Sequence, residues 1–423
     1  MLKLPDTVNG KVLFQWMKFL APVAAIAGLI SFVAVTWFGF GKDGYWAGDF
    51  AYYFAGGKCF IKGSNMYAVD CVGPILAELY GYTLLAGVSY PPHFAPFTLI
   101  FAIVPYSFAS YVFYFANVIA CLFMAKIISD TSIRLKLRQA ISKSGSFQWA
   151  LFLVLGSTGI WAAVWLGQIT VFVAICLWMA FRQIEIGNDF VASILLALAS
   201  VKPQMAALVF LWILLNGRYK ILAFSALTAG ILSIYTFAIM GFVPAIESWL
   251  NAVAMYQNYP INQLGNNTIM GIPSFLALYD ASLPVWAGLL VGGVVVLFLR
   301  WKSLIEPFSP MALATILLLQ MTIFSRPYDL IFIAPAFALF WPTDRSNTFR
   351  IVLFFAAAAL YCFPQQLVVR VIPFPEAGHF RTLLLVVLLI GCVRQMLRGH
   401  NQFHDLALDQ PSVGSQTAQT GTL

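Results

Sequence analysis

Long apolar runs separated by short polar stretches dominate the pattern along the chain. An α-helix needs about 20 apolar residues to cross the hydrocarbon core of a bilayer, and segments such as Met17–Phe40, Tyr106–Ile128 and Tyr219–Met240 meet that length. Such runs are far too many for the buried core of a soluble domain. The pattern predicts an all-α polytopic membrane protein with about 10–13 transmembrane helices.

Several apolar runs are shorter or are interrupted by polar residues and prolines. Phe94–Val104 is too short to cross comfortably, so we expect a re-entrant or tilted half-helix there. Phe190–Ser200 and Met205–Leu215 flank Val201-Lys202-Pro203-Gln204, which predicts an interrupted pair of helices surrounded by protein or a wet cavity. The other expected spans are Phe147–Leu166 and Ile169–Arg182, which form a hairpin with an outer turn at Gly167-Gln168, and Leu283–Leu299, Met311–Phe324, Leu330–Trp341, Ile351–Phe363 and Leu383–Met396.

The spans divide the chain into a transmembrane domain, two longer outer loops and two polar ends. We expect a cytoplasmic N-terminal segment over residues 1–16, the transmembrane domain over 17–398, and a disordered cytoplasmic tail over 399–423, which is rich in Gln, Ser, Thr and Gly. The first outer loop covers 41–91, with a weak helical pattern near its end, and the second covers 241–273. The chain has no convincing internal repeat, which counts against the repeat-built transporter folds.

Composition and charge agree with this class and indicate an orientation. Of the 423 residues, 61% are hydrophobic and 9% charged, with a mean hydropathy of +0.85, whereas about 25% of residues in soluble domains are charged. The net charge of +8 comes from basic residues gathered at the ends of spans. This positive-inside pattern places both termini in the cytoplasm and argues against nucleic-acid binding. The basic residues at these span ends are Lys3, Lys11, Lys18, Lys126, Arg134, Lys136, Arg138, Lys143, Arg218, Lys220, Arg300, Lys302, Arg345, Arg350, Arg394 and Arg398.

Neither the cysteines nor the histidines form a metal-binding pattern. Six cysteines are scattered, and only Cys59 and Cys71 share the first outer loop. In an oxidising compartment they can form a disulfide, and two free thiols are the alternative. The four histidines lack the spacing of a metal site. We therefore expect neither a metal nor another cofactor.

Polar side chains are scarce on the outer side and at membrane depth, so those that occur there are candidates for a functional site. Asp49 follows the first span almost at once and is the one well-placed acid. One acid with a few cations and amides suits a reaction that deprotonates a hydroxyl while a phosphate is held. The other candidates are Tyr52, Tyr53, Tyr90, Gln168, Lys202, Gln204, Asn266, Asn267, Arg326 and Asp329.

Each candidate also has an ordinary structural explanation. Asp49 can cap a helix through backbone amides, and the tyrosines can belong to the aromatic belt of the membrane interface. Lys202 can extend toward headgroups, and the two glutamines can satisfy backbone groups that the helix breaks leave open. Asn266-Asn267-Thr268 is also a glycosylation sequon, and Arg326 can pair with Asp329 at the interface. The aromatic run beside Asp49 favours a functional role most strongly for that acid.

Six short motifs follow one another in an order that resembles a known family. They are Gly48-Asp49-Phe50 with Tyr52-Tyr53, Gly63 with Tyr67, Tyr90-Pro91-Pro92, Gly167-Gln168, Lys202-Pro203-Gln204 and Gly265-Asn266-Asn267-Thr268. Together they resemble the bacterial polyprenyl-phosphate-dependent mannosyltransferases of glycosyltransferase family 87. The resemblance covers most of the chain, from Asp49 to Asp329.

The resemblance implies the GT-C architecture, in which many transmembrane helices carry an active site at the outer membrane surface. It also implies that a hexose, typically mannose, leaves a polyprenyl-phosphate carrier with inversion, and that Asp49 is the general base. Lys202 and Arg326 would then hold the carrier phosphate, and the remaining candidates would contact substrate. The family commonly has a His before the late Asp, whereas this chain has Tyr328-Asp329. That departure shifts the expected phosphate contact to Arg326.

We therefore expect a glycosyltransferase of the bacterial plasma (inner) membrane that acts on a hydroxyl of a lipid-linked or cell-envelope glycan. Its expected partners are membrane lipids, the carrier-linked donor as co-substrate, and the acceptor. One alternative is a transporter or a lipid or glycolipid flippase, which predicts functional charges at the midplane. Another is a polysaccharide ligase or polymerase, which usually has its large outer loop late in the chain. The largest expected outer loop here comes first.

Overall fold

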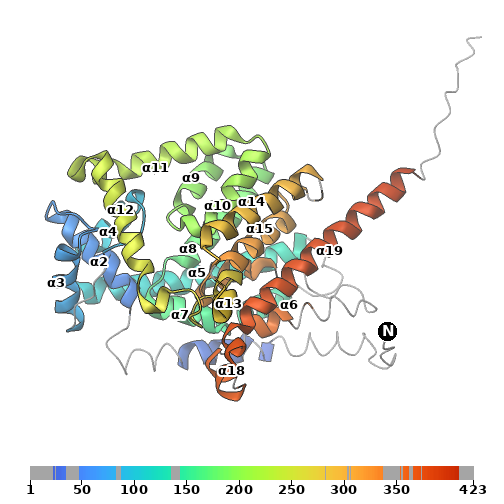
Figure 1. Ribbon diagram of the computed structural model, residues 1–423, viewed down its shortest axis with the longest axis horizontal. Coiled ribbons are helices and arrows are strands. Elements are labelled where there is room, and N and C mark those ends of the chain that lie inside the picture. The colour runs from blue at the N-terminus through green and yellow to red at the C-terminus, as the bar shows by residue number, and fades with distance from the viewer. Residues whose placement is uncertain are drawn as a thin grey trace, which may run out of the picture.

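The computed structural model is built from helices (Figure 1). It describes residues 22–23, 25–34, 47–81, 87–134, 143–281, 283–302, 304, 306–336, 353, 356–361, 365–372 and 374–408. Within these ranges the one β-type pairing is an isolated antiparallel bridge between Met270 and Ser325. The elements are α2 (Gly48–Ile61), α3 (Val69–Tyr80), η1 (Pro92–Phe94), α4 (Ala95–Ala102), α5 (Tyr106–Arg134), α6 (Lys143–Leu155), α7 (Thr158–Leu166), α8 (Thr170–Glu185), α9 (Asp189–Ala199), α10 (Pro203–Leu215), α11 (Tyr219–Met240), α12 (Phe242–Gln257), η3 (Pro260–Asn262), α13 (Ile272–Leu276), η4 (Ala277–Tyr279), α14 (Val285–Trp301), α15 (Pro310–Ile323), η5 (Pro327–Ala336), α18 (Gln365–Val371), η6 (Pro375–His379) and α19 (Phe380–Leu408).

Several of these helices have the length and composition of membrane spans. Three qualify in the described part of the chain, over Tyr106–Thr131, Tyr219–Met240 and Pro375–Arg394. Helices α6 and α7 add a fourth if their pair, bent by 63°, counts as one broken span. On α14, Trp286 and Val294 are both 65% exposed, as expected for a lipid-facing surface. These features confirm the predicted all-α polytopic class, while the number of about 10–13 spans stays a prediction.

Helices α8 to α11 run back and forth between a basic end and an opposite end. At the basic end, Arg218 Nη1 lies 3.7 Å from Asp189 Oδ2, so the α8–α9 and α10–α11 turns are neighbours. At the opposite end, Lys202 Nζ donates to Thr170 Oγ1 at 2.5 Å, which joins the α9–α10 break to the start of α8. Pro203 begins α10 because a missing N–H is tolerated in the first helical turn. The predicted interrupted helix pair is therefore confirmed.

Helix α2 packs directly on α4, although the sequence indicated no helix at this position. Gly57 makes this possible, because a Cβ there would lie 2.3 Å from the carbonyl oxygen of Thr98. On the same helix, Phe50 stacks on Phe113 with ring centroids 4.8 Å apart. The two contacts bury one face of α2 against α4 and α5, so the start of the first outer loop is a fixed part of the fold.

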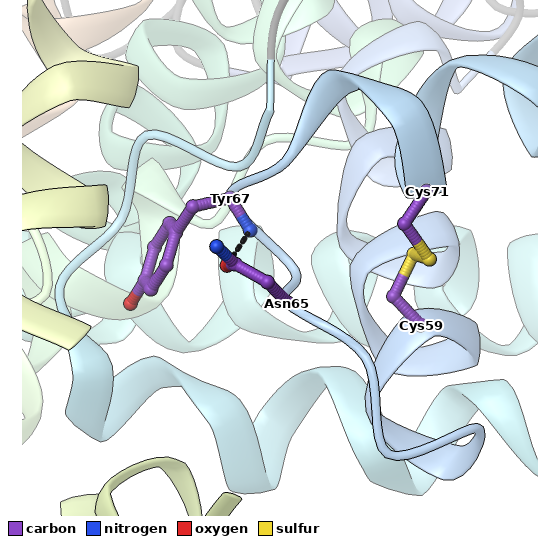
Figure 2. The surroundings of a disulfide bond; sticks show 4 residues. All are labelled: Cys59, Asn65, Tyr67 and Cys71. Atoms are coloured by element: carbon purple, nitrogen blue, oxygen red, sulfur yellow. Dashed lines mark hydrogen bonds between the residues drawn. A yellow bond between two sulfur atoms is a disulfide. The ribbon is translucent and has the colours of Figure 1, made fainter. Parts of the chain in front are cut away.

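A disulfide joins the two helices of the first outer loop (Figure 2). Cys59 on α2 and Cys71 on α3 have Cα atoms 6.0 Å apart, within the usual range for a disulfide. Between them, Asn65 Oδ1 accepts a hydrogen bond of 2.8 Å from the N–H of Tyr67 and shapes the connecting turn. Of the two alternatives that the sequence left open, the structure has the disulfide.

The segment expected as the second outer loop is not irregular. It forms α12, η3 and the start of α13, and α12 lies between α11 and the centre of the molecule (Figure 1). Helix α12 buries Ala245 and Ala252 and exposes Phe242 and Leu250. A mixture of apolar and polar positions with two small buried residues is typical of a helix that lies on a surface, so a search for spanning runs does not detect it.

Near the C-terminal end, one expected span stays a prediction and the expected start of the disordered tail is wrong. Leu330–Trp341 was expected to span the membrane, but its described part belongs to the 3-10 helix η5, in which Asp329–Ala336 are all buried. Burial by protein does not decide whether a segment crosses the membrane, and residues 337–341 lie outside the described part of the chain, so this span stays a prediction. The tail was expected to be disordered from residue 399, but α19 continues to Leu408, because helix propagation is cooperative. The expected segment 1–16, residues 409–423 and six of the thirteen residues of Ile351–Phe363 lie outside the described residues.

The disulfide predicts a specific loss of stability. Replacing both Cys59 and Cys71 by Ala should lower the melting temperature in detergent, because a link across a separation of 12 residues stabilises by about 3 kcal/mol. Cys176→Ala, which removes a free thiol, is the matched control and should have little effect. Full maleimide labelling of Cys59 and Cys71 in unreduced protein would contradict the pairing.

Candidate active site

The start of α2 and the end of α7 meet, and this contact places Asp49. Ala47 precedes α2 with a left-handed φ of 57°, and its N–H donates to a carbonyl oxygen near the end of α7 at 2.9 Å. Helix α7 ends at Gly167 with φ 69°, where a Cβ would lie 2.6 Å from the Cβ of Phe50. Only glycine permits both this backbone conformation and this approach. Asp49 in the first turn of α2 therefore lies beside Gln168.

Gln168 joins Asp49 to two tyrosines through hydrogen bonds. Its Nε2 donates to Asp49 Oδ2, and its Oε1 accepts from the Tyr90 hydroxyl at 3.3 Å. The hydroxyls of Tyr90 and Tyr53 are 3.0 Å apart, and their rings meet edge to face with centroids 5.2 Å apart. Four residues that the sequence singled out thus form one continuous chain of side chains.

Gln168 also leads to a buried ion pair. Thr170 Oγ1 donates to Gln168 Oε1 at 3.4 Å and accepts from Lys202 Nζ. Lys202 Nζ lies 3.0 Å from Asp329 Oδ1, and both side chains are only 3% exposed. A charge so buried is stable only when it is paired and hydrogen-bonded. Thr170 and Asp329 together supply these contacts, so the Lys202 ammonium is fixed in position.

The segment that carries Asp329 also holds a second buried cation. The Arg326 N–H donates to Asp329 Oδ2 at 2.9 Å, which closes a tight turn. The Arg326 guanidinium donates to the Ile261 carbonyl oxygen at 3.3 Å and to Asn262 Oδ1. Both of these acceptors are neutral, and the guanidinium has five N–H groups in all. The Arg326 guanidinium can therefore donate hydrogen bonds to a further, anionic partner.

Tyr328 lies between Arg326 and Asp329 in the sequence and contacts the other cation, Lys202. Lys202 Nζ is 4.7 Å from the centroid of the Tyr328 ring, within the range of a cation–π contact. The second outer segment reaches the site through Ile261 and Asn262, whose oxygens accept hydrogen bonds from the Arg326 guanidinium.

The electrostatic surroundings of Asp49 favour a base rather than a permanently ionised acid. Asp49 keeps intermediate exposure, but its carboxyl lies deep among protein atoms, and this burial raises its pKa above 3.8. The Gln168 hydrogen bond and the charges of Arg326 and Lys202 oppose the rise. A carboxylate with a raised pKa accepts a proton more readily than an ordinary aspartate.

The tyrosines beside Asp49 are neutral hydrogen-bonding groups. Burial raises the pKa of Tyr53, Tyr90 and Tyr328 well above 10.0, and the charge of Asp49 adds to the rise in all three. Each phenol therefore keeps its proton near neutral pH. The site thus combines one basic carboxylate, two fixed cations and several hydroxyl donors, which suits a sugar and its phosphate.

The remaining predicted residues have other surroundings. Tyr52 packs against the apolar cluster around the disulfide and against the main core. Gln204 is exposed on the first turn of α10, and Asn267 is also exposed. Asn266 Oδ1 accepts from the backbone and side chain of Thr268 at 2.9 and 2.8 Å, and so shapes its own turn. Direct substrate contact by these four residues stays a prediction.

The sequence interpretation missed several members of the site. Thr170 stands two residues after Gln168 on the predicted outer turn, and Tyr328 stands between Arg326 and Asp329, so adjacency was an available signal. Asn262 gave no such signal, because the segment that contains it was interpreted as a loop. Among the described residues, no group of three or more His, Cys, Asp and Glu side chains could hold a metal ion.

Comparison with known proteins gives one match. The family model of Glycosyltransferase family 87 matches residues 89–325, more than half of the 423-residue chain. No curated protein and no solved structure matches the chain. The matched range contains Tyr90, Gln168 and Lys202, whereas Asp49 precedes it and Asp329 follows it. The match therefore supports the family, and the fold alone brings Asp49 to the matched residues.

Breaking the buried ion pair should destabilise the protein strongly. Asp329→Asn leaves the Lys202 ammonium buried without its counter-ion, which we expect to reduce the free energy of unfolding by about 3–5 kcal/mol. Combining Lys202→Met with Asp329→Leu removes both charges and should restore most of that loss. Glu247→Gln removes an exposed carboxylate and serves as the control. Equal thermal stability of the single and double variants in detergent would contradict this account.

Proposed function

The chain belongs to glycosyltransferase family 87, and we propose that it transfers a hexose, typically mannose, from a polyprenyl-phosphate carrier to a hydroxyl of a lipid-linked or cell-envelope glycan. It is a membrane glycosyltransferase; the carrier, the sugar and the acceptor are our proposal. The observation that carries it is the pairing of one basic carboxylate, Asp49, with two buried cations, Lys202 and Arg326, whose charges act on it. The attacking hydroxyl needs a base such as Asp49 to take its proton. The phosphate leaving group needs cations such as Lys202 and Arg326 to stabilise its negative charge.

In the proposed reaction, the hydroxyl oxygen of the acceptor attacks the anomeric carbon, and Asp49 accepts the proton of that hydroxyl. The new bond joins this oxygen to the anomeric carbon, and the bond from that carbon to the carrier phosphate oxygen breaks. A single displacement of this kind inverts the anomeric centre. A positioned general base contributes about 10²–10⁴-fold in rate, and the fixed cations stabilise the charge that develops on the leaving group.

The charge arrangement fits this displacement. The phosphodiester of the donor carries one negative charge, and the released polyprenyl phosphate carries a second as Asp49 becomes neutral. Negative charge therefore moves from Asp49 to the phosphate during the reaction. Lys202 is held by Asp329 and Thr170, so it need not reorganise when this charge arrives.

Tyr53, Tyr90 and Gln168 are proposed to hold the sugar or the acceptor next to Asp49. Their side chains are already joined to one another and to the carboxylate, so they form a preorganised surface. Tyr52, Gln204, Asn266 and Asn267 are proposed as more distant substrate contacts. The donor acts as co-substrate, and we propose no separate cofactor or metal.

We propose that the site works on the outer face of a bacterial plasma membrane, with both termini in the cytoplasm. Two features support this side. The Cys59–Cys71 disulfide of the first outer loop requires an oxidising compartment. The basic turn near Arg218 lies at the far end of the α8–α11 helices from Lys202, and basic ends prefer the cytoplasm.

Asp49→Asn should reduce transfer from polyprenyl-phosphate-mannose by about 10²–10⁴-fold, because an amide cannot accept the acceptor proton. The measurement is the incorporation of labelled sugar by membranes that contain each variant. Asp70→Asn, an exposed acid on α3 of the same outer loop, is the control and should transfer normally. Equal transfer by wild type and Asp49→Asn would exclude Asp49 as the base.

The rate should fall as pH falls through the raised pKa of Asp49, because only the ionised carboxylate accepts a proton. The acidic limb of the rate profile should therefore lie above the 3.8 of an ordinary aspartate. The Gln168 hydrogen bond lowers this pKa, so Gln168→Leu should move the limb to still higher pH. Gln183→Leu, near the far end of α8, should leave the limb in place. If Gln168→Leu moved the acidic limb of the rate profile to lower pH, the assignment of that limb to Asp49 would be contradicted.

A further inference from the structure

Ala47, the residue before α2, has a backbone conformation that its surroundings must hold. Its φ of 57° and ψ of 33° are left-handed, which is uncommon for residues other than glycine, and such a conformation persists only where neighbouring groups restrain it. Its N–H donates to the Trp165 carbonyl oxygen at 2.9 Å, and its carbonyl oxygen accepts from the Tyr106 hydroxyl at 3.4 Å. Asp49 follows two residues later, so these two contacts also restrain the proposed base.

The Tyr106 hydroxyl is itself held by α3. Tyr80, the last residue of α3, has its hydroxyl oxygen 2.7 Å from that of Tyr106. A tyrosine hydroxyl has a single proton, and the proton of Tyr106 is directed to the Ala47 carbonyl oxygen. Tyr80 is therefore the donor to Tyr106, and the hydrogen bonds run in one direction from α3 through the start of α5 to the residue before α2.

The ring of Tyr106 is packed against α2 as well. It stacks on Phe50 with ring centroids 6.1 Å apart and meets Phe54 edge to face with centroids 5.2 Å apart. Phe50 directly follows Asp49, and Phe54 lies about one turn further along the same helix. These ring contacts orient the hydroxyl of Tyr106 toward the start of α2, and a phenylalanine in its place would keep them.

Helix α3 is in turn held against α2. The two helices lie side by side (Figure 1) and are joined by the Cys59–Cys71 disulfide at the end of α2 and the start of α3. They also share an apolar cluster, whose buried members besides Cys59 are Ala51, Ala55, Val72 and Leu76. The far end of α3, which carries Tyr80, is therefore kept at the start of α2.

We propose that Tyr106, supported by Tyr80, is a positioning residue that holds the Asp49 carboxylate where it can take the proton of the acceptor hydroxyl. This inference rests on the proposed function for the role of Asp49, and it gives α3 a part in the reaction.

Asp49 depends on such a restraint because it lies in the first turn of α2. The first N–H groups of a helix have no partner within the helix, and among the described residues no side chain caps the start of α2. A general base must lie within hydrogen-bonding reach of the proton it accepts, and a small displacement lowers the rate of the chemical step. Loss of the Tyr106 hydroxyl should therefore lower kcat rather than weaken donor binding.

The test compares Tyr106→Phe, Tyr80→Phe and the double variant, each made also in the Asp49→Asn background. Tyr235→Phe is the matched control, because it removes a hydroxyl that donates to the Phe60 carbonyl oxygen at 3.3 Å near the other end of α2. Amide hydrogen exchange is measured with purified protein in nanodiscs, and kcat and the donor KM for polyprenyl-phosphate-mannose are measured in parallel. Melting temperatures identify any variant that fails to fold.

Tyr106→Phe should speed amide exchange over residues 47–51 by roughly three- to tenfold, the effect of one lost hydrogen bond, and leave the amides near Phe60 unchanged. The value of kcat should fall by a similar factor, with little change in the donor KM. In the Asp49→Asn background Tyr106→Phe should cause no further loss of kcat, because it acts through that carboxylate. Tyr80→Phe should act in the same direction, and the double variant should match Tyr106→Phe. Tyr235→Phe should leave kcat and the exchange over residues 47–51 unchanged.

Unchanged exchange over residues 47–51 in Tyr106→Phe, an equal effect of Tyr235→Phe there, or a full further loss of kcat in the Asp49→Asn background would each overturn the proposal. Effects of Tyr106→Phe and Tyr80→Phe that multiply would overturn the supporting role of Tyr80. Wild-type protein that transfers no sugar, or Asp49→Asn that transfers normally, would instead refute the proposed function. The exchange comparison would still decide whether Tyr106 holds the start of α2.

Discussion

The buried ion pair between Lys202 and Asp329 joins segments 127 residues apart in the sequence, and the arrangement of the site depends on it. Removing two charges from water is unfavourable unless the ion pair has good geometry and its remaining donors and acceptors form hydrogen bonds. Thr170 Oγ1 accepts a hydrogen bond from Lys202, and the backbone N–H of Arg326 donates one to the second carboxylate oxygen of Asp329. The pair therefore links the start of α8, the α9–α10 break and the turn before η5. None of these segments can shift without leaving a charge exposed to an apolar interior.

A second constraint is the close approach of backbone around α7. At one end of this short helix a Cβ on Gly159 would lie 2.0 Å from the Pro327 carbonyl oxygen, and at the other a Cβ on Gly167 would lie 2.6 Å from Phe50. The two glycines are eight residues apart, about 12 Å along an α-helix. Helix α7 thus sets the spacing between the α2 end, which carries Asp49, and the turn that carries Arg326. A displacement needs its base and its leaving-group contacts held at a fixed separation.

The outer segments complete the site from two sides. The disulfide stabilises the first outer loop, in which α2 carries the Asp49 carboxylate. Hydrogen bonds from Asn65 to Ser248 and from Trp249 to Ser89 attach α12 of the second outer segment to this loop. Asp49 keeps some exposure while Lys202 is almost fully buried. This difference is consistent with an acceptor that approaches from the accessible side and with a cation that acts on the phosphate from within.

The sequence by itself determined the class of protein and the long spans such as Tyr219–Met240, and it singled out Asp49, Gln168 and Lys202 as candidates for the site. Apolar length and the scarcity of charge are local properties, so they can be read without a fold. Only the tertiary structure decided that η5 is a buried 3-10 helix, that α12 is a helix, and that Asn262 reaches the Arg326 guanidinium. These outcomes depend on which surfaces meet. An apolar run looks the same whether lipid or protein covers it, and the contact of Asn262 with Arg326, 64 residues away, is set by packing rather than by neighbours in the chain.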